Sequence, residues 1–307
     1  MTAYSAGVLQ HAVRRRFQAR LRARVAGPDV ELRERRIYRS DGERHFHPDD
    51  PIWWVHSDPA IFAGGIRALL VQSLHPLAMA GVAGHSGFQS DPWGRLQRTS
   101  NWIATTTYAP TADAERLAAA VRGIHDGVRG TTSDGHAYAA SDPHLLGWVH
   151  AAEAESFLTA HQALGARRLT PSQADTYVAQ IGSCSARLGL PDPPRTVAQL
   201  QGALTAYLPE LRISPEAEQV RDFLLQQPPL PRAERPAYAV LAAAAVATLP
   251  PWAADLLDLQ RSPRAACLAI ESARAATRFM RWATEHPAHS GRWAHAARAD
   301  AAQHAPT

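Results

Sequence analysis

One histidine in this sequence lies beside an apolar stripe of a predicted helix. After residue 111 the apolar residues recur at helical spacing, at Leu117, Val121, Ile124 and Val128. His125 neighbours that stripe. An imidazole directed into an apolar interior either makes a buried hydrogen bond or ligates a metal or haem iron. The spacing alone leaves both interpretations open, a core histidine and a ligand.

A cationic helix face precedes this histidine. In DPWGRLQRT, residues 91–99, Pro and Gly indicate a loop that turns into a helix, which places Arg95, Arg98 and Thr99 on one face. Trp102 and Thr106 continue it. Two guanidinium groups and a hydroxyl suit propionates or another anion, because Arg stays charged and offers forked donors. The alternative is a solvated basic face that makes surface ion pairs.

Four segments between residues 61 and 149 give the sequence a recognisable order. They read GGIRALLVQSLHPLAMAGVAGHS, DPWGRLQRT, IHDGVRG and AYAASDPHLLGWV. In that order and spacing they resemble the oxygenase MpaB / rubber oxygenase (latex clearing protein) catalytic-domain family, with weaker similarity to about residue 283. The resemblance implies an all-α fold, a multi-helix globin-like core with additional peripheral helices, that binds haem b.

The resemblance also implies roles for single residues. His125 matches the family's proximal iron ligand, so it is the expected metal ligand. Arg95, Arg98 and Thr99 match pocket positions and are expected to contact the cofactor and to take part in catalysis. Arg98 stands where rubber oxygenases carry a distal lysine, and a guanidinium with a pKa above about 12 has no free lone pair for iron. If Arg98 is not distal, His75 is a first alternative, together with His85.

These residues lead to a functional expectation with alternatives. The first is a haem b-dependent oxygenase or oxidase that acts on a hydrophobic small molecule with dioxygen or peroxide. Polyisoprene is not the expected substrate, because no glutamate occurs between Val71 and Arg98, where rubber oxygenases use one. The second is a non-catalytic haem- or lipophile-binding helical protein. The third is a haem-free helical enzyme with His150 and Glu153 as an acid and base pair.

Composition narrows the class of protein. The chain has 307 residues, 46% hydrophobic and 20% charged, which is typical of a soluble globular protein. Its net charge of +4 accompanies no zinc-finger, RNP-like or helix-turn-helix pattern, so nucleic-acid binding is not expected. Cys184 and Cys267 form no disulfide framework or metal motif, which favours the cytoplasm. The longest apolar run, 237–249, is too short for a transmembrane span and predicts a buried helix.

The predicted organisation has three parts. Residues 1–50 form an N-terminal basic helix and loop, residues 51–285 a single all-helical domain, and residues 286–307 a polar C-terminal tail. Later helices are expected at about 171–187, 196–206, 214–226, 234–248 and 264–284, and no strand is expected. Gly64 and Gly65 fall inside a predicted helix, where they indicate close approach of either a neighbouring backbone or a macrocycle. The oligomeric state is not predicted.

Overall fold

The computed structural model describes residues 2–25, 30–85, 91–132 and 134–284, and almost all regular structure in them is helical. The α-helices are α1 (Thr2–Val25), α2 (Val30–Glu34), α3 (Pro51–Ser57), α4 (Ala60–Gln72), α5 (Pro76–His85), α6 (Pro92–Tyr108), α7 (Thr111–Gly127), α8 (Pro143–Leu164), α9 (Pro171–Ala186), α10 (Val197–Tyr207), α11 (Pro215–Leu225), α12 (Arg235–Ala247), α13 (Pro251–Leu256) and α14 (Pro263–Thr284). This confirms the predicted all-α class. The globin-like arrangement stays a prediction, and the predicted tail over 286–307 lies outside the described residues.

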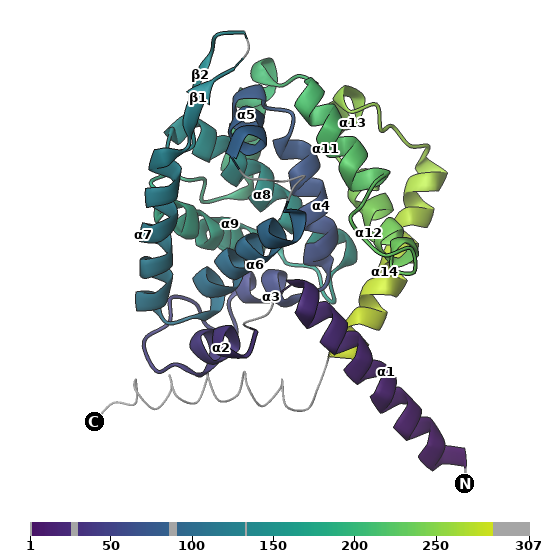
Figure 1. Ribbon diagram of the computed structural model, residues 1–307. Helices are drawn as coiled ribbons and strands as arrows, with labels where there is room; N and C mark the ends of the chain where they lie inside the picture. Colours follow the sequence, from purple (N-terminus) through teal and green to yellow (C-terminus); the bar gives the residue numbers. More distant parts are fainter. Residues whose placement is uncertain (1, 26–29, 86–90, 133, 285–307) are drawn as a thin grey trace.

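Helices α4 and α8 pack against each other at the centre of the molecule (Figure 1). Gly64 makes this close approach feasible, because a Cβ atom there would lie 2.9 Å from Cδ1 of Phe157 and 3.2 Å from Cβ of Ala160. A Cβ atom on Gly65 would meet nothing within 4 Å. Of the two interpretations of this glycine pair, the structure therefore favours tight helix packing at Gly64.

The later helices confirm the boundaries predicted from the turn residues. The helix expected at 171–187 is α9, and a capping box of Thr170 and Gln173 defines its start. The apolar run at 237–249 lies mostly in α12, where Leu241 and Val246 are buried. The short helix α13 was not predicted, since the two adjacent prolines at its start, Pro250 and Pro251, indicated a turn. Pro251 instead occupies the first turn of α13, a position that needs no amide donor.

Two predictions about irregular segments are wrong. Strands β1 (Arg129–Thr131) and β2 (Ala137–Ala139) form an antiparallel hairpin in which Gly130 pairs with Tyr138, although no strand was expected. Three residues are too few to show an alternating pattern. The loop that was expected to follow the basic helix within residues 1–50 contains α2 and a π-helix, η1 (Arg35–Arg39). Burial of Ile37 anchors that π-helix.

None of the helices in the described residues is both long and apolar enough to cross a membrane by itself. Helix α4 and residues 76–82 of α5 have the required length and composition only together, and the chain bends by 114° between them.

Candidate functional site

The predicted site residues lie on two consecutive helices, α6 and α7. Asp91 caps the start of α6 by accepting a hydrogen bond from the amide of Gly94 at 2.9 Å. Arg95 and Arg98 follow in the first turns of α6, whereas His125 lies in the last turn of α7. Figure 1 shows the two helices leaving their connecting turn in different directions. The fold therefore groups the two arginines and holds His125 at the far end of the neighbouring helix.

The arginines of α6 differ in their surroundings. Burial lowers the pKa of Arg95, and the nearby charge of Arg98 lowers it further, so the Arg95 guanidinium is largely withdrawn from water beside Arg98. The side chain of Arg98 is 62% exposed, and its Nη1 lies 3.2 Å from Oδ2 of Asp91. Thr99 is exposed as well. The predicted face exists, but only Arg95 turns inward, and Arg98 makes the surface ion pair that was the alternative.

His125 has a ring nitrogen that needs a partner. Its Nδ1 atom is buried, and the part of the chain that the structure describes gives it no hydrogen-bond partner. Burial lowers the pKa of His125, opposed by the charge of Asp126, which favours a neutral imidazole. On the same helix Ile124 is 63% exposed, and on α6 Leu96 is 37% exposed. His125 therefore lacks the buried hydrogen bond expected of a core histidine, and apolar side chains on both helices stay accessible.

Farther along α6, Trp102 and Thr106 line a small cavity in the interior. Ile103 of α6 lines it too, and the remaining lining residues come from α3, α8 and α9 and are His56, Glu153, Ile181, Cys184 and Ser185. Its volume is about 10 Å³, which is enough for about one water molecule. Both ring nitrogens of His56 have a polar partner. Its Nδ1 lies 2.8 Å from Oγ1 of Thr107, and its Nε2 lies 3.4 Å from the hydroxyl of Tyr177.

The titratable groups of this cavity have strongly shifted pKa values. Burial raises the pKa of Glu153 to about 7 and lowers that of His150, one helical turn away on α8, to about 4. Burial, followed by the charge of His161, lowers the pKa of His56 to about 3. Near neutral pH His56 and His150 are therefore uncharged, and Glu153 is close to half protonated.

Sequence reasoning found only part of this cavity. It singled out the lining residue Glu153, as the partner of His150 in a possible acid and base pair, but missed His56 and Cys184. Their signal lies in tertiary packing, because α3 and α9 bring them to α8 from distant parts of the chain. Nδ1 of the His150 ring lies 2.9 Å from Oγ of Ser185.

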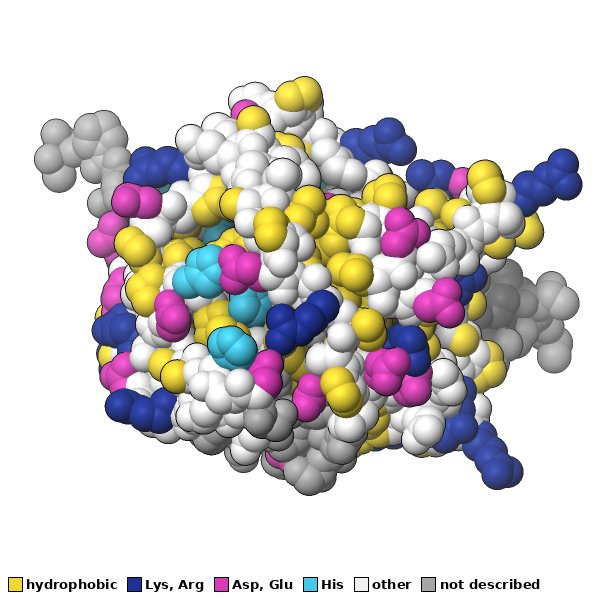
Figure 2. Space-filling view, turned by 90° about the horizontal axis from the view of Figure 1, so that it is seen from above, with side chains coloured by type: hydrophobic (Ala, Val, Ile, Leu, Met, Phe, Trp, Pro, Cys, Tyr) yellow, Lys and Arg dark blue, Asp and Glu magenta, His cyan; other side chains and the backbone are white. Residues whose placement is uncertain are grey.

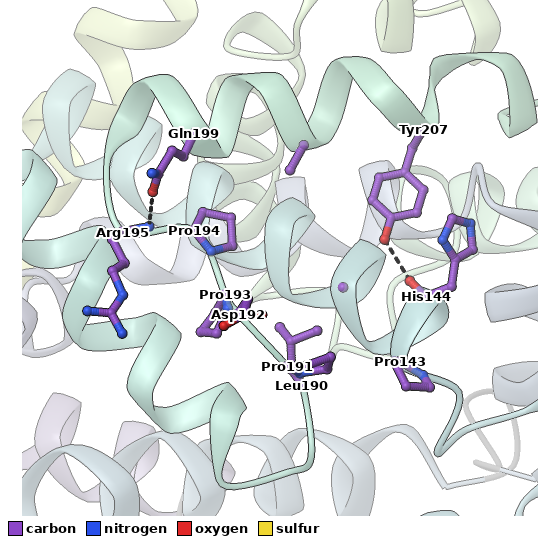
Figure 3. Close-up of a pocket in the computed structure, with 12 residues that line it drawn as sticks. Pro143, His144, Leu190, Pro191, Asp192, Pro193, Pro194, Arg195, Gln199 and Tyr207 are labelled. Atoms are coloured by element: carbon purple, nitrogen blue, oxygen red, sulfur yellow. Dashed lines mark hydrogen bonds between the residues drawn. The ribbon is translucent and has the colours of Figure 1, made fainter.

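A larger hollow is lined by none of the predicted site residues. It has a volume of about 670 Å³ and lies between the start of α8, the segment 190–195 and α10 (Figure 3). Gln199 accepts a hydrogen bond from the amide of Arg195 at 2.8 Å, and the hydroxyl of Tyr207 donates to the carbonyl of His144 at 2.7 Å. The proline-rich segment of its wall had indicated only a turn. Its size suits a small molecule.

The comparisons with known proteins identify the family. The family model described as ER-bound oxygenase mpaB/B'/Rubber oxygenase, catalytic domain, matches residues 53–282, which is more than half of the chain. The match covers α6, α7 and the interior cavity. Neither the curated proteins nor the solved structures give a significant match. The chain therefore belongs to the ER-bound oxygenase mpaB/B'/rubber oxygenase catalytic-domain family.

Proposed function

We propose that this protein is a haem b-dependent oxygenase or oxidase that acts on a hydrophobic small molecule with dioxygen or peroxide. Family membership supports the oxygenase reaction class. The observation that carries the haem proposal is His125, whose buried Nδ1 has no hydrogen-bond partner in the described part of the chain. A metal ligand is one of the two ordinary uses of such an imidazole, and the other, a buried hydrogen bond, is not made by this nitrogen.

The side chains of α6 and α7 fit haem by their chemistry. A neutral imidazole is a common axial ligand of haem iron, and burial keeps His125 neutral near pH 7. Leu96 and Ile124 offer exposed apolar surface to a macrocycle. Bound haem would supply the activation of dioxygen or peroxide, which protein side chains alone do not provide.

The polar residues of α6 have distinct proposed roles. Arg95 binds a propionate or another anion, because a guanidinium withdrawn from water forms strong charge-assisted hydrogen bonds. Arg98 and Thr99 lie at the accessible rim, and Arg98 has to release Asp91 before it can contact a ligand. Glu153, with a pKa of about 7, is close to half protonated near neutral pH, so its carboxyl group is suited to give or take a proton.

The substrate is proposed to be a hydrophobic molecule other than polyisoprene. Arg98 offers no lone pair to iron where rubber oxygenases have lysine, and the chain has no glutamate between Val71 and Arg98. These two differences affect the residues that rubber oxygenases use around the iron. The chain keeps the other two matching residues, His125 and Arg95.

The proposal is tested first by absorption spectroscopy. Purified protein supplied with haem is expected to show a Soret band, which His125→Ala loses or shifts. His47→Ala is the matched control, because His47 is exposed and is expected to leave the spectrum unchanged. Circular dichroism verifies that both variants are folded. An unchanged spectrum in His125→Ala would remove His125 from the proposed role.

A measurement of turnover distinguishes the proposed enzyme from the alternative, a non-catalytic binding protein. Oxygen consumption is measured with the haem-loaded protein, a reductant and a panel of terpenoid, aromatic and peptide compounds. Steady consumption with one class supports an enzyme. Tight haem binding without consumption across the panel supports the non-catalytic haem-binding alternative, and failure to take up haem would contradict both.

A further inference from the structure

We propose that His75, His144 and Glu210 form a binding site for one divalent transition-metal ion, separate from the residues assigned to haem. The three come from the link between α4 and α5, the start of α8, and the 3-10 helix η2 (Leu208–Glu210). These segments lie at the hairpin end of the molecule. Figure 2 faces this end and shows histidine and acidic side chains gathered to the left of its centre.

The donor atoms of this cluster already converge. Oε2 of Glu210 lies 3.2 Å from Nε2 of His75 and 2.8 Å from Nε2 of His144, and the ligand atoms of all three residues lie within 4.8 Å of one another. Donors that share a metal ion at about 2.1 Å are about 3.0–3.4 Å apart in octahedral or tetrahedral geometry. Both edges of the triangle that include Glu210 are therefore close to the required length.

One ligand of the cluster is fixed and the other two are accessible. His75 is 1% exposed, and its ring lies 5.9 Å from that of Trp148 and 6.2 Å from that of Tyr207. The side chains of His144 and Glu210 are 52% and 41% exposed. A cation can therefore reach His144 and Glu210 from solvent, and Glu210 has to shift from Nε2 of His75 for the ion to contact that buried imidazole.

The surroundings of His75 allow the required tautomer. To bind a metal through Nε2, a neutral imidazole must carry its proton on Nδ1. The amide of Ala78 lies 3.5 Å from that Nδ1 atom, which is longer than an ordinary hydrogen bond and holds the other tautomer only weakly. The usual support of a metal-bound histidine is a hydrogen bond from its other ring nitrogen to a carbonyl, a carboxylate or water.

The donor set decides the class of metal. Two imidazole nitrogens and one carboxylate oxygen suit Zn²⁺ or Fe²⁺, whereas Ca²⁺ and Mg²⁺ prefer oxygen donors alone. Three protein ligands leave at least one position for water or another small ligand. His144 also lines the 670 Å³ hollow, with Tyr207 beside it at a ring distance of 4.7 Å, so the metal would lie at the edge of that hollow. A hydrogen-bonded cluster without metal is the alternative.

Metal binding is tested on haem-free protein treated with a chelator and then dialysed against Zn²⁺. Elemental analysis is expected to find about one tightly bound Zn²⁺ per chain. His144→Ala and Glu210→Gln are each expected to weaken binding by at least about tenfold, since each removes a donor. Both side chains are partly exposed, so thermal melting should show intact folding. The control is His136→Ala, an exposed histidine on the hairpin, which is expected to bind normally.

A second readout does not depend on any variant. Co²⁺ added to the wild-type protein is expected to give visible absorption bands of bound nitrogen and oxygen donors, and excess Zn²⁺ should remove them. Absence of these bands together with absence of Zn²⁺ uptake would overturn the proposal, as would uptake that is unchanged in His144→Ala and Glu210→Gln. His125→Ala is expected to bind Zn²⁺ normally, so this result is independent of the haem proposal.

Discussion

Arg67 on α4 and Glu155 on α8 form a buried two-point ion pair at the centre of the fold. Nη2 of Arg67 donates to Oε1 of Glu155 at 2.9 Å, and Nη1 contacts Oε2. The same guanidinium donates to Oγ of Ser156 at 2.7 Å and to the carbonyl of Thr248, at the end of α12, at 2.9 Å. A side chain that is 1% exposed thus joins three helices.

Replacing Arg67 is therefore expected to destabilise the whole domain. Arg67→Ala should lower the free energy of unfolding by about 3–5 kcal/mol, because it leaves the Glu155 carboxylate buried without its partner. Urea unfolding measures this change. Arg98→Ala is the control, since its ion pair with Asp91 is exposed and worth at most about 1 kcal/mol. Equal losses in the two variants would refute a special role for the buried pair.

Two adjacent glycines provide a matched test of the α4–α8 packing. Gly64→Ala should destabilise the protein by about 1–3 kcal/mol, because its Cβ atom would lie 2.9 Å from the ring of Phe157. Gly65→Ala should be neutral or stabilising by up to about 1 kcal/mol, since its Cβ atom meets nothing within 4 Å and alanine favours the helix. Thermal unfolding compares them, and a reversed order would contradict the packing described.

Local sequence signals predicted the helices well where a proline stands at the start of a helix. Pro143 and Pro171 occupy the first turns of α8 and α9, as expected from residues that cannot continue a preceding helix. The same reasoning failed at Pro251, where proline begins a short helix instead of ending one. A proline indicates that a helix begins or ends nearby, and tertiary packing decides whether it begins or ends there.

The candidate sites show a similar limit. Helical spacing correctly placed Arg95 and Arg98 on one helix, but it did not indicate that one is withdrawn from water and the other exposed. The contact between His75 and Glu210 joins positions 135 residues apart, so no local spacing could reveal it. Residue types identify which chemistry is available, whereas the crossing of helices determines which side chains meet.

Glu153 is expected to make stability depend on pH. Its pKa is raised from 4.5 to about 7 in the folded protein by burial. Between these pH values the folded state binds more protons than the unfolded state, so the free energy of unfolding falls as pH rises. The stabilising contribution is complete below pH 4.5 and is lost above about pH 7, and the shift corresponds to about 3 kcal/mol at most.

Comparison of Glu153→Gln with the wild type isolates this contribution. His150, with a pKa lowered to about 4, acts in the opposite direction, because its unfolded form takes up protons first as pH falls. That effect is common to both proteins. Glu153→Gln should therefore gain stability relative to wild type between pH 5 and 7.5 in urea unfolding, and the exposed Glu271→Gln should not. A constant difference across this range would show that Glu153 does not titrate there.

The two arginines of α6 are expected to affect bound haem differently. Arg95 is the inward guanidinium, so Arg95→Ala should lower haem retention if it pairs with a propionate. Arg98→Ala should keep haem but weaken cyanide or azide binding, because a charge-assisted hydrogen bond worth roughly 1.5–3 kcal/mol is lost. Arg98→Lys should permit a nitrogen-bound ferric spectrum at alkaline pH, since lysine has a lone pair once deprotonated. Unchanged anion affinity with poorer haem retention in Arg98→Ala would instead assign Arg98 to the propionates.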